Sequence, residues 1–115
     1  MFPGVESVRV FVKPGQTDMR KSINGLAGLA QLVLRKDPLS GDLFIFCNRH
    51  RTIMKILYWN RNGFCLWLKK LEKHRFPWPR TEQECLEITE QQLDWLLRGI
   101  DFWNAHETLK FSHVT

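Results

Sequence analysis

The residues best suited to chemistry in this sequence are the basic and aromatic side chains crowded between Leu43 and Arg80. This stretch holds nine Lys or Arg residues and eight aromatic residues, whereas its one acidic residue is Glu72. Cationic side chains attract phosphate groups and release counterions from nucleic acid, and aromatic rings can stack on bases. The composition of this stretch therefore indicates a polyanion as the binding partner.

The charge is separated along the chain. Residues 1–80 contain 15 Lys and Arg against 5 Asp and Glu, a net charge of +10, whereas residues 81–115 contain 2 against 7, a net charge of −5. The basic part would attract phosphate. The acidic part could dock on the basic part, oppose a basic partner or repel unwanted nucleic acid.

Catalytic motifs are not apparent in the basic part. Metal-assisted phosphoryl transfer requires clustered carboxylates, and the acidic residues before residue 81 are scattered along the sequence. The sequence also lacks a nucleophile elbow and a glycine-rich phosphate loop. We therefore expect that the protein is not an enzyme, and a nuclease that uses Asp18 or Asp42 is the less favoured alternative.

The cysteines and the apolar runs bear on cofactors and location. Cys47, Cys65 and Cys85 include no CxxC pair, so neither a disulfide framework nor a structural metal site is expected. The sequence shows no secretion signal and no apolar run long enough to span a membrane. These observations predict reduced thiols, no cofactor, no small-molecule substrate, no membrane partner and a cytoplasmic location.

Short strands must position the candidate residues. Residues 43–47 form an apolar run typical of a central strand, and residues 53–59 and 64–69 follow it after short loops. These segments predict an antiparallel meander over residues 43–69. The two hairpin tips of this meander carry basic residues: Arg49, His50 and Arg51 on the first tip and Arg61 on the second.

Two helices accompany the predicted meander. Apolar residues at helical spacing predict a helix over residues 19–35, whose Gly25 and Gly28 are expected to permit close packing against a sheet. A capping box that begins at Thr89 predicts a second helix near residues 90–99. Both helices need a partner surface for their apolar faces, and the sheet would supply it.

The whole pattern predicts one α+β domain over residues 1–115. A first strand near residues 8–12 and a short strand at residues 85–88 add to the meander, so we expect an antiparallel sheet of about four to six strands. Beyond the anchors at residues 101–104 the periodicity is weak. We therefore expect a frayed tail over about residues 105–115.

The basic residues of the tips and of the connector after the third strand form the predicted phosphate-binding surface. One end or edge of the sheet could gather them, and they would contact phosphates without reading base sequence. The competing interpretation is that these charges are solvated and that Phe44, Phe46, Tyr58 and Trp67 belong to the core. The predicted nucleic-acid-binding residues are Arg49, His50, Arg51, Arg61, Lys69, Lys70, Lys73, Arg75, Arg20 and Lys21.

Arg20 and Lys21 stand apart from the other candidates because they open the predicted first helix. Positive charge at a helix N-terminus opposes the helix dipole, so local stability does not explain these residues well. Two interpretations are open at this point. The two cations either pair with Asp18 or Asp42, or they add to the same anion-binding surface.

Several motifs together resemble a known family. They are TDMRK at residues 17–21, GLA at 25–27, LFIF at 43–46, KILYW at 55–59, GF at 63–64, LEK at 71–73, RFPWP at 75–79, the segment 93–97 and GID at 99–101. The combination is similar to the small accessory proteins, called TnpB, that are encoded by the second reading frame of the insertion-sequence class numbered sixty-six. This family is distinct from the RNA-guided nucleases that share the name. The match spans residues 8–104, and Asn60 departs from it because an acidic residue is expected after Tyr58-Trp59.

The resemblance implies a role in DNA transposition beside a separate transposase that carries the acidic catalytic residues. It assigns no catalytic or binding residue to this chain. We therefore predict a non-catalytic accessory protein that binds the DNA phosphate backbone, or the transposase–DNA complex and other proteins of the same element. The alternative is an adaptor that stabilises the transposase without touching DNA, with exposed Trp78, Trp95 and Trp103 as its contacts.

Overall fold

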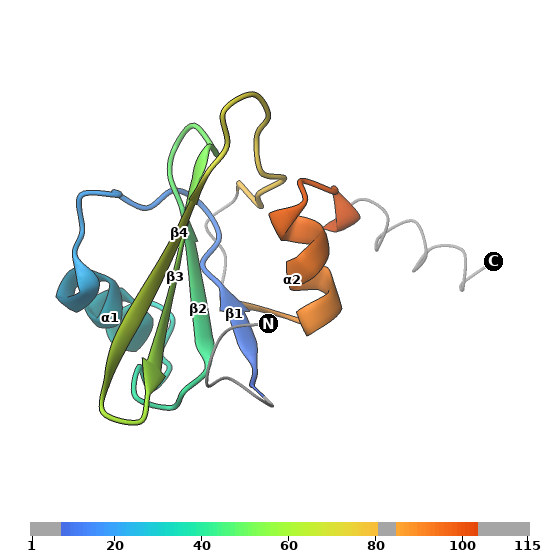
Figure 1. Cartoon of the computed structure of the whole chain (residues 1–115). Helices are drawn as coiled ribbons and strands as arrows, with labels where there is room; N and C mark the ends of the chain where they lie inside the picture. Colours follow the sequence, from blue (N-terminus) through green and yellow to red (C-terminus); the bar gives the residue numbers. More distant parts are fainter. Residues whose placement is uncertain (1–7, 81–84, 104–115) are drawn as a thin grey trace.

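The computed structural model describes residues 8–80 and 85–103, which form a five-stranded sheet between two helices (Figure 1). The strand order is β4-β3-β2-β1-β5, with α1 on one face of the sheet and α2 on the other. The elements are β1 Val10–Val12, α1 Ile23–Leu32, β2 Leu43–Cys47, β3 Ile53–Asn60, β4 Gly63–Lys70, β5 Leu86–Ile88 and α2 Glu90–Leu97.

Strand β2 is the centre of the sheet, and both of its faces are covered. All five of its residues are buried, as its continuous apolar run predicts. Phe44 and Phe46 pack with Leu26 of α1, whereas Ile45, which points to the opposite face, belongs to the cluster that contains Leu93 of α2. The apolar run is therefore explained by two hydrophobic layers rather than by one.

The sheet is mixed, so the expectation of a purely antiparallel sheet is wrong. Strands β2, β3 and β4 form the predicted antiparallel meander, but β1 pairs parallel with β2, and β5 pairs antiparallel with β1. The connection explains the parallel pair: a crossover that contains a helix returns the chain to the end of the sheet from which the first strand began. The α+β class itself is confirmed.

Both predicted helices are present and are shorter than expected. Helix α1 begins after the N-cap Ser22, and α2 begins with the predicted capping box. In that box, the Gln92 backbone N–H donates to Thr89 Oγ1 at 3.0 Å, and the Thr89 N–H donates to Gln92 Oε1 at 2.9 Å. Gly99 follows the end of α2 with φ of 80°, the left-handed conformation that commonly terminates a helix.

The two glycines of α1 do not have the predicted role. A Cβ atom added at Gly28 would meet no described atom within 4 Å, and one added at Gly25 would lie nearest to Lys21 Cβ, at 3.3 Å. Neither position is a close contact with the sheet. The expectation that these glycines permit close packing against the sheet is therefore wrong.

The segment at residues 71–80 has no regular secondary structure, as its prolines predict, yet it contributes to the core. Phe76 and Trp78 are 1% and 6% exposed and pack in the same cluster as α2. The Trp78 indole N–H donates to the carbonyl oxygens of Lys13 at 3.2 Å and Gly15 at 3.0 Å. Both the ring and the N–H of Trp78 are thus engaged inside the fold, so the expectation that Trp78 is exposed as a protein contact is wrong.

The other two tryptophans predicted as protein contacts are partly buried. Trp95 and Trp103 pack against the cluster beneath α2, and the Trp103 indole N–H donates to the Pro77 carbonyl oxygen at 2.7 Å. Both have structural contacts, and their role in protein binding stays a prediction. The tail predicted over about residues 105–115 lies outside the described residues.

Two further findings concern the part of the chain that the structure describes. None of its helices is long and apolar enough to cross a membrane. Its three cysteines are free thiols, and no group of His, Cys, Asp and Glu within residues 8–80 and 85–103 is arranged to hold a metal ion. Burial raises the pKa of the Cys47 thiol to about 12, so this thiol is uncharged at neutral pH.

Candidate nucleic-acid interface

Several predicted cations lie at one end of the sheet. Because β1 and β2 are parallel, their C-terminal ends are together, and residues 13–20 and the first hairpin tip, residues 48–52, continue from them (Figure 1). The connector at residues 70–80 passes the same end, because the Phe76 N–H donates to the Arg51 carbonyl oxygen at 2.7 Å. We call this surface, formed by residues 13–20, 48–52 and 70–80, the basic end.

The first hairpin tip is held by a side chain of its own. Asn48 Oδ1 accepts hydrogen bonds from the backbone N–H groups of Thr52 at 2.8 Å and Ile53 at 3.0 Å, and Asn48 Nδ2 donates to Thr52 Oγ1 at 3.1 Å. Arg51 in this tip has φ of 61°. A residue other than glycine in that region costs on the order of 1 kcal/mol, so the tip keeps an arginine where local conformation favours glycine or asparagine.

The segment after β1 is tied to the tip and to the connector. The Thr17 N–H donates to the Cys47 carbonyl oxygen, and the Gly15 N–H donates to the Pro79 carbonyl oxygen, both at 2.8 Å. Lys13 is buried, and its Nζ donates to the carbonyl oxygens of Pro14 at 3.4 Å and Gln16 at 3.2 Å. Long-range bonds therefore fix the backbone on each side of the space between these segments.

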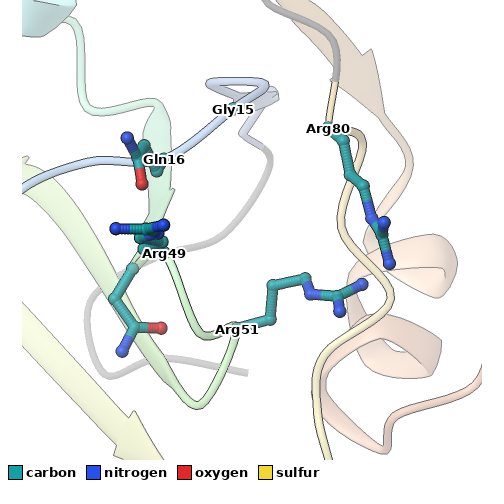
Figure 2. A pocket seen from close by; sticks show the side chains of 6 residues that line it. Gly15, Gln16, Arg49, Arg51 and Arg80 are labelled. Carbon is teal, nitrogen blue, oxygen red and sulfur yellow. The ribbon is translucent and has the colours of Figure 1, made fainter.

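A groove of about 360 Å³ lies between the three segments. Its lining residues are Gly15, Gln16, Asn48, Arg49, Arg51 and Arg80. Figure 2 shows the side chains of Arg51 and Arg80 extending toward one another from the tip and the connector. A wider hollow of about 620 Å³ shares Gln16, Asn48 and Arg49 with this groove and extends past His50 to Arg20.

Among the described residues, the cations that line the groove are not matched by carboxylates. The ion pairs within residues 8–80 and 85–103 are Arg9–Glu87, Arg20–Asp18 and Arg98–Asp94. Arg49, Arg51 and Arg80 therefore have no carboxylate partner among the described residues. Like charges that converge without a counter-charge raise the local positive potential, and an anion placed between them would lower the energy.

Arg20 is paired with Asp18, as the first of the two interpretations expects, and its contact with DNA stays a prediction. Its guanidinium lies 2.7 Å from the Asp18 carboxylate, and its hydrogen bonds lower the pKa of Asp18 to about 2. This pair neutralises most of the charge that Arg20 would add to the hollow. Lys21 is exposed next to the pair.

The remaining predicted cations are divided between the two ends of the sheet. Lys70, Lys73 and Arg75 are exposed at the end of β4 and on the connector, within the basic end. Lys69 is engaged structurally, because its Nζ donates to the Leu97 carbonyl oxygen at 2.8 Å at the end of α2. Arg61 lies at the other tip.

The position of Arg61 corrects the expectation that one end of the sheet gathers all the basic residues. The eight residues of β3 separate the two tips, a distance of about 26 Å at the usual rise of a strand. Arg61 has φ of 59° in its own tight turn. Its predicted contact with DNA is therefore separate from the basic end.

Two of the Lys and Arg residues of this end, Lys13 and Arg80, were absent from the predicted site. Arg80 closes the basic stretch in sequence, and it was missed because its place opposite Arg51 depends on the bond between Gly15 and Pro79. Lys13 looked like a turn residue beside Pro14. The one sequence feature that could have indicated Arg80 as a site residue is the stretch rich in Lys and Arg that ends there.

Comparisons with known proteins agree with the sequence motifs. A family model described as "IS66 Orf2 like protein" matches residues 8–107. The chain is 40% identical to uncharacterized protein y4hO of Sinorhizobium fredii over 99% of each chain. It is 30% identical to uncharacterized protein y4jC of the same organism, over 83% of this chain and 81% of that protein. No solved structure matches the chain.

Proposed function

Because this chain belongs to the IS66 Orf2-like family, an accessory and non-catalytic family associated with insertion-sequence transposition, we propose that it binds DNA through the basic end. The observation that carries this proposal is the convergence of Arg51 and Arg80 on one groove without a carboxylate between them among the described residues. In this proposal the protein binds the phosphate backbone of DNA, and the transposase of the same element catalyses the transposition reaction.

The surroundings of the groove support a contact with the backbone rather than with bases. The exposed side chains of the basic end are mainly cations on loops, and most aromatic rings of the same stretch are buried in the two layers beside the sheet. Phosphate contacts by Arg and Lys fix position without carrying sequence information. We therefore infer salt-dependent binding with little base preference.

Fluorescence anisotropy with a labelled duplex at several salt concentrations tests the proposal. Arg49→Glu combined with Arg51→Glu should weaken binding at least tenfold and make the slope of log K against log [salt] shallower by about 2, since each lost phosphate contact removes about 0.9. The matched control is Arg35→Glu with Lys36→Glu, two cations in the loop after α1 that do not line the groove and are not among the predicted DNA contacts. Equal losses in both double variants would contradict a localised interface.

A second candidate function has one observation in its favour. Three large apolar side chains at the end of α1 and in the loop after it are exposed: Leu32 by 77%, Val33 by 55% and Leu39 by 53%. Most other large apolar side chains of the described residues are covered. Such a surface suits an adaptor that docks on the transposase. Co-purification with the transposase, together with no duplex binding even at low salt, would favour the adaptor over the DNA-binding protein.

A further inference from the structure

We propose that the groove between Arg51 and Arg80 is a pocket for a single phosphate group of a nucleic-acid strand, a specific site within a surface that otherwise attracts DNA by general charge. The inference deepens the proposed function and rests on it for the source of the phosphate. That source is either an internal phosphodiester or the phosphate monoester at a strand end. The pocket is argued from its charge, its fixed walls and its polar lining.

The charge of the groove matches a phosphate oxyanion. Arg51 and Arg80 come from different segments and extend into the same space, and Arg49 lines it as well (Figure 2). A guanidinium presents a planar fork of donors that can bind two phosphate oxygens at once. A phosphate group has more acceptor oxygens than a carboxylate and can accept from more than one guanidinium at once. A phosphate monoester also carries up to two negative charges, whereas an internal phosphodiester carries one, as a carboxylate does.

The walls of the groove are fixed by bonds that do not involve the arginine side chains. The Arg51 carbonyl oxygen accepts from the Phe76 N–H, and Pro79, next to Arg80, accepts from the Gly15 N–H. Trp78 between them is buried and donates to Lys13 and Gly15. The protein backbone around the groove is therefore already ordered before a ligand enters, which reduces the entropy cost of binding.

The lining adds neutral polar groups to the cations. Gln16 and Asn48 belong both to the groove and to the adjoining hollow, which also contains Thr17. Thr17 is 5% exposed, and its Oγ1 has no hydrogen-bond partner among the described residues. Because the Thr17 hydroxyl oxygen is buried and Thr17 does not line the groove itself, the neutral polar groups available to a ligand in the groove are Gln16 and Asn48.

The groove is large enough to hold a phosphate group. At about 360 Å³ it lies near the lower end of the range of small-ligand pockets, roughly 300 to 1,000 Å³. Continuous duplex backbone would instead lie across the exposed cations on its rim. The groove and the rim thus make two distinguishable contributions to binding.

The test is an NMR titration of the arginine Nε–Hε signals of the full chain with inorganic phosphate at constant ionic strength. We expect saturable shifts for Arg51 and Arg80 and no saturable shift for Arg61. Arg80→Gln should weaken phosphate binding at least tenfold, and Arg51→Lys should weaken it less, because it keeps the charge and loses the fork. Arg61→Gln is the matched control, and the amide spectrum of each variant reports whether it is folded.

Unsaturable or uniform shifts of all exposed arginines, or an affinity that Arg80→Gln leaves unchanged, would overturn the pocket. An oligonucleotide with a 5′-phosphate that binds at least tenfold more tightly than its 5′-hydroxyl form identifies the strand end as the source, and equal affinities identify the internal phosphodiester. DNA binding that depends on Arg49 and is indifferent to Arg80→Gln keeps the proposed function and rejects the pocket. Phosphate binding at Arg51 and Arg80 without DNA binding at low salt rejects the proposed function and keeps the phosphate site.

Discussion

Replacement of Trp78 by phenylalanine tests how the basic end is built. The indole N–H donates to the carbonyl oxygens of Lys13 and Gly15, and the ring is 6% exposed. The substitution leaves two carbonyl oxygens without this donor, at a cost of about 1 to 3 kcal/mol, and the lost part of the ring leaves a void that costs roughly 1 kcal/mol more. The expected loss in the free energy of unfolding is therefore about 2 to 4 kcal/mol.

Urea unfolding followed by tryptophan fluorescence measures this loss. With a slope of about 2 kcal/mol per molar urea, the midpoint should fall by about 1 to 2 M. The matched control is Trp59→Phe, in a half-buried residue that stacks edge to face on Phe64 with ring centroids 5.0 Å apart, where we expect a loss below about 1 kcal/mol. Equal losses in the two variants would refute the role of the indole N–H in holding the segment after β1.

Three further predictions concern other parts of the chain. Gly28→Ala should raise the free energy of unfolding by up to about 1 kcal/mol, because the position is helical and has room for a Cβ atom. Gly99→Ala should lower the free energy of unfolding, because φ there is 80°. Thermal melts of the two variants measure both changes. The Cys47 thiol should not react with a thiol reagent at pH 8 in the folded protein, because burial raises its pKa to about 12, and rapid native-state labelling of Cys47, located by mass spectrometry, would contradict its burial. Arg20 lowers the pKa of the Asp18 carboxylate to about 2. The ionised carboxylate therefore stabilises the folded state above the ordinary pKa of Asp, and this stabilisation is lost as the pH falls through about 2. An NMR titration of Asp18 should show a midpoint near 2, which should return toward about 4 in Arg20→Gln.

The parts of the fold that depend on neighbouring residues could be predicted from the sequence. The capping box at Thr89 is a pattern of four residues, and the turn at residues 60–63 lies between two strands that pair directly. The apolar run of β2 also indicated a central strand. In the first two cases the energy that decides the structure comes from residues within a few positions of one another. The run of β2 predicts burial on both faces, although the side chains that cover it come from distant elements.

The errors arose where the decisive contacts are distant in sequence. The parallel pairing of β1 with β2 follows from α1 crossing between them, and the burial of Trp78 follows from carbonyl groups 63 and 65 positions away. The partners of Lys55 are likewise remote, since its Nζ donates to the carbonyl oxygens of Met19 at 2.8 Å and Lys21 at 3.3 Å. Periodicity and charge counts do not contain this information.

The candidate site also combines features that neighbouring residues predict with features that depend on contacts distant in sequence. The tip that carries Arg49 and Arg51 was predicted from strand and turn signals, and the structure places both residues on the groove. Arg61 shares their sequence pattern and lies about one strand length away, whereas Arg80 lacks the pattern and lies opposite Arg51. Which cations act together is therefore set by topology rather than by clustering in the sequence.

The most direct test of DNA binding at the basic end is an amide chemical-shift map of the protein titrated with a short duplex at low salt. We predict that the perturbed amides cluster in residues 13–20, 48–52 and 70–80 and that the shifts diminish as salt is added. The tip at residues 60–63 should change little. Perturbation centred on that tip or on α2, or no perturbation at low salt, would contradict the account.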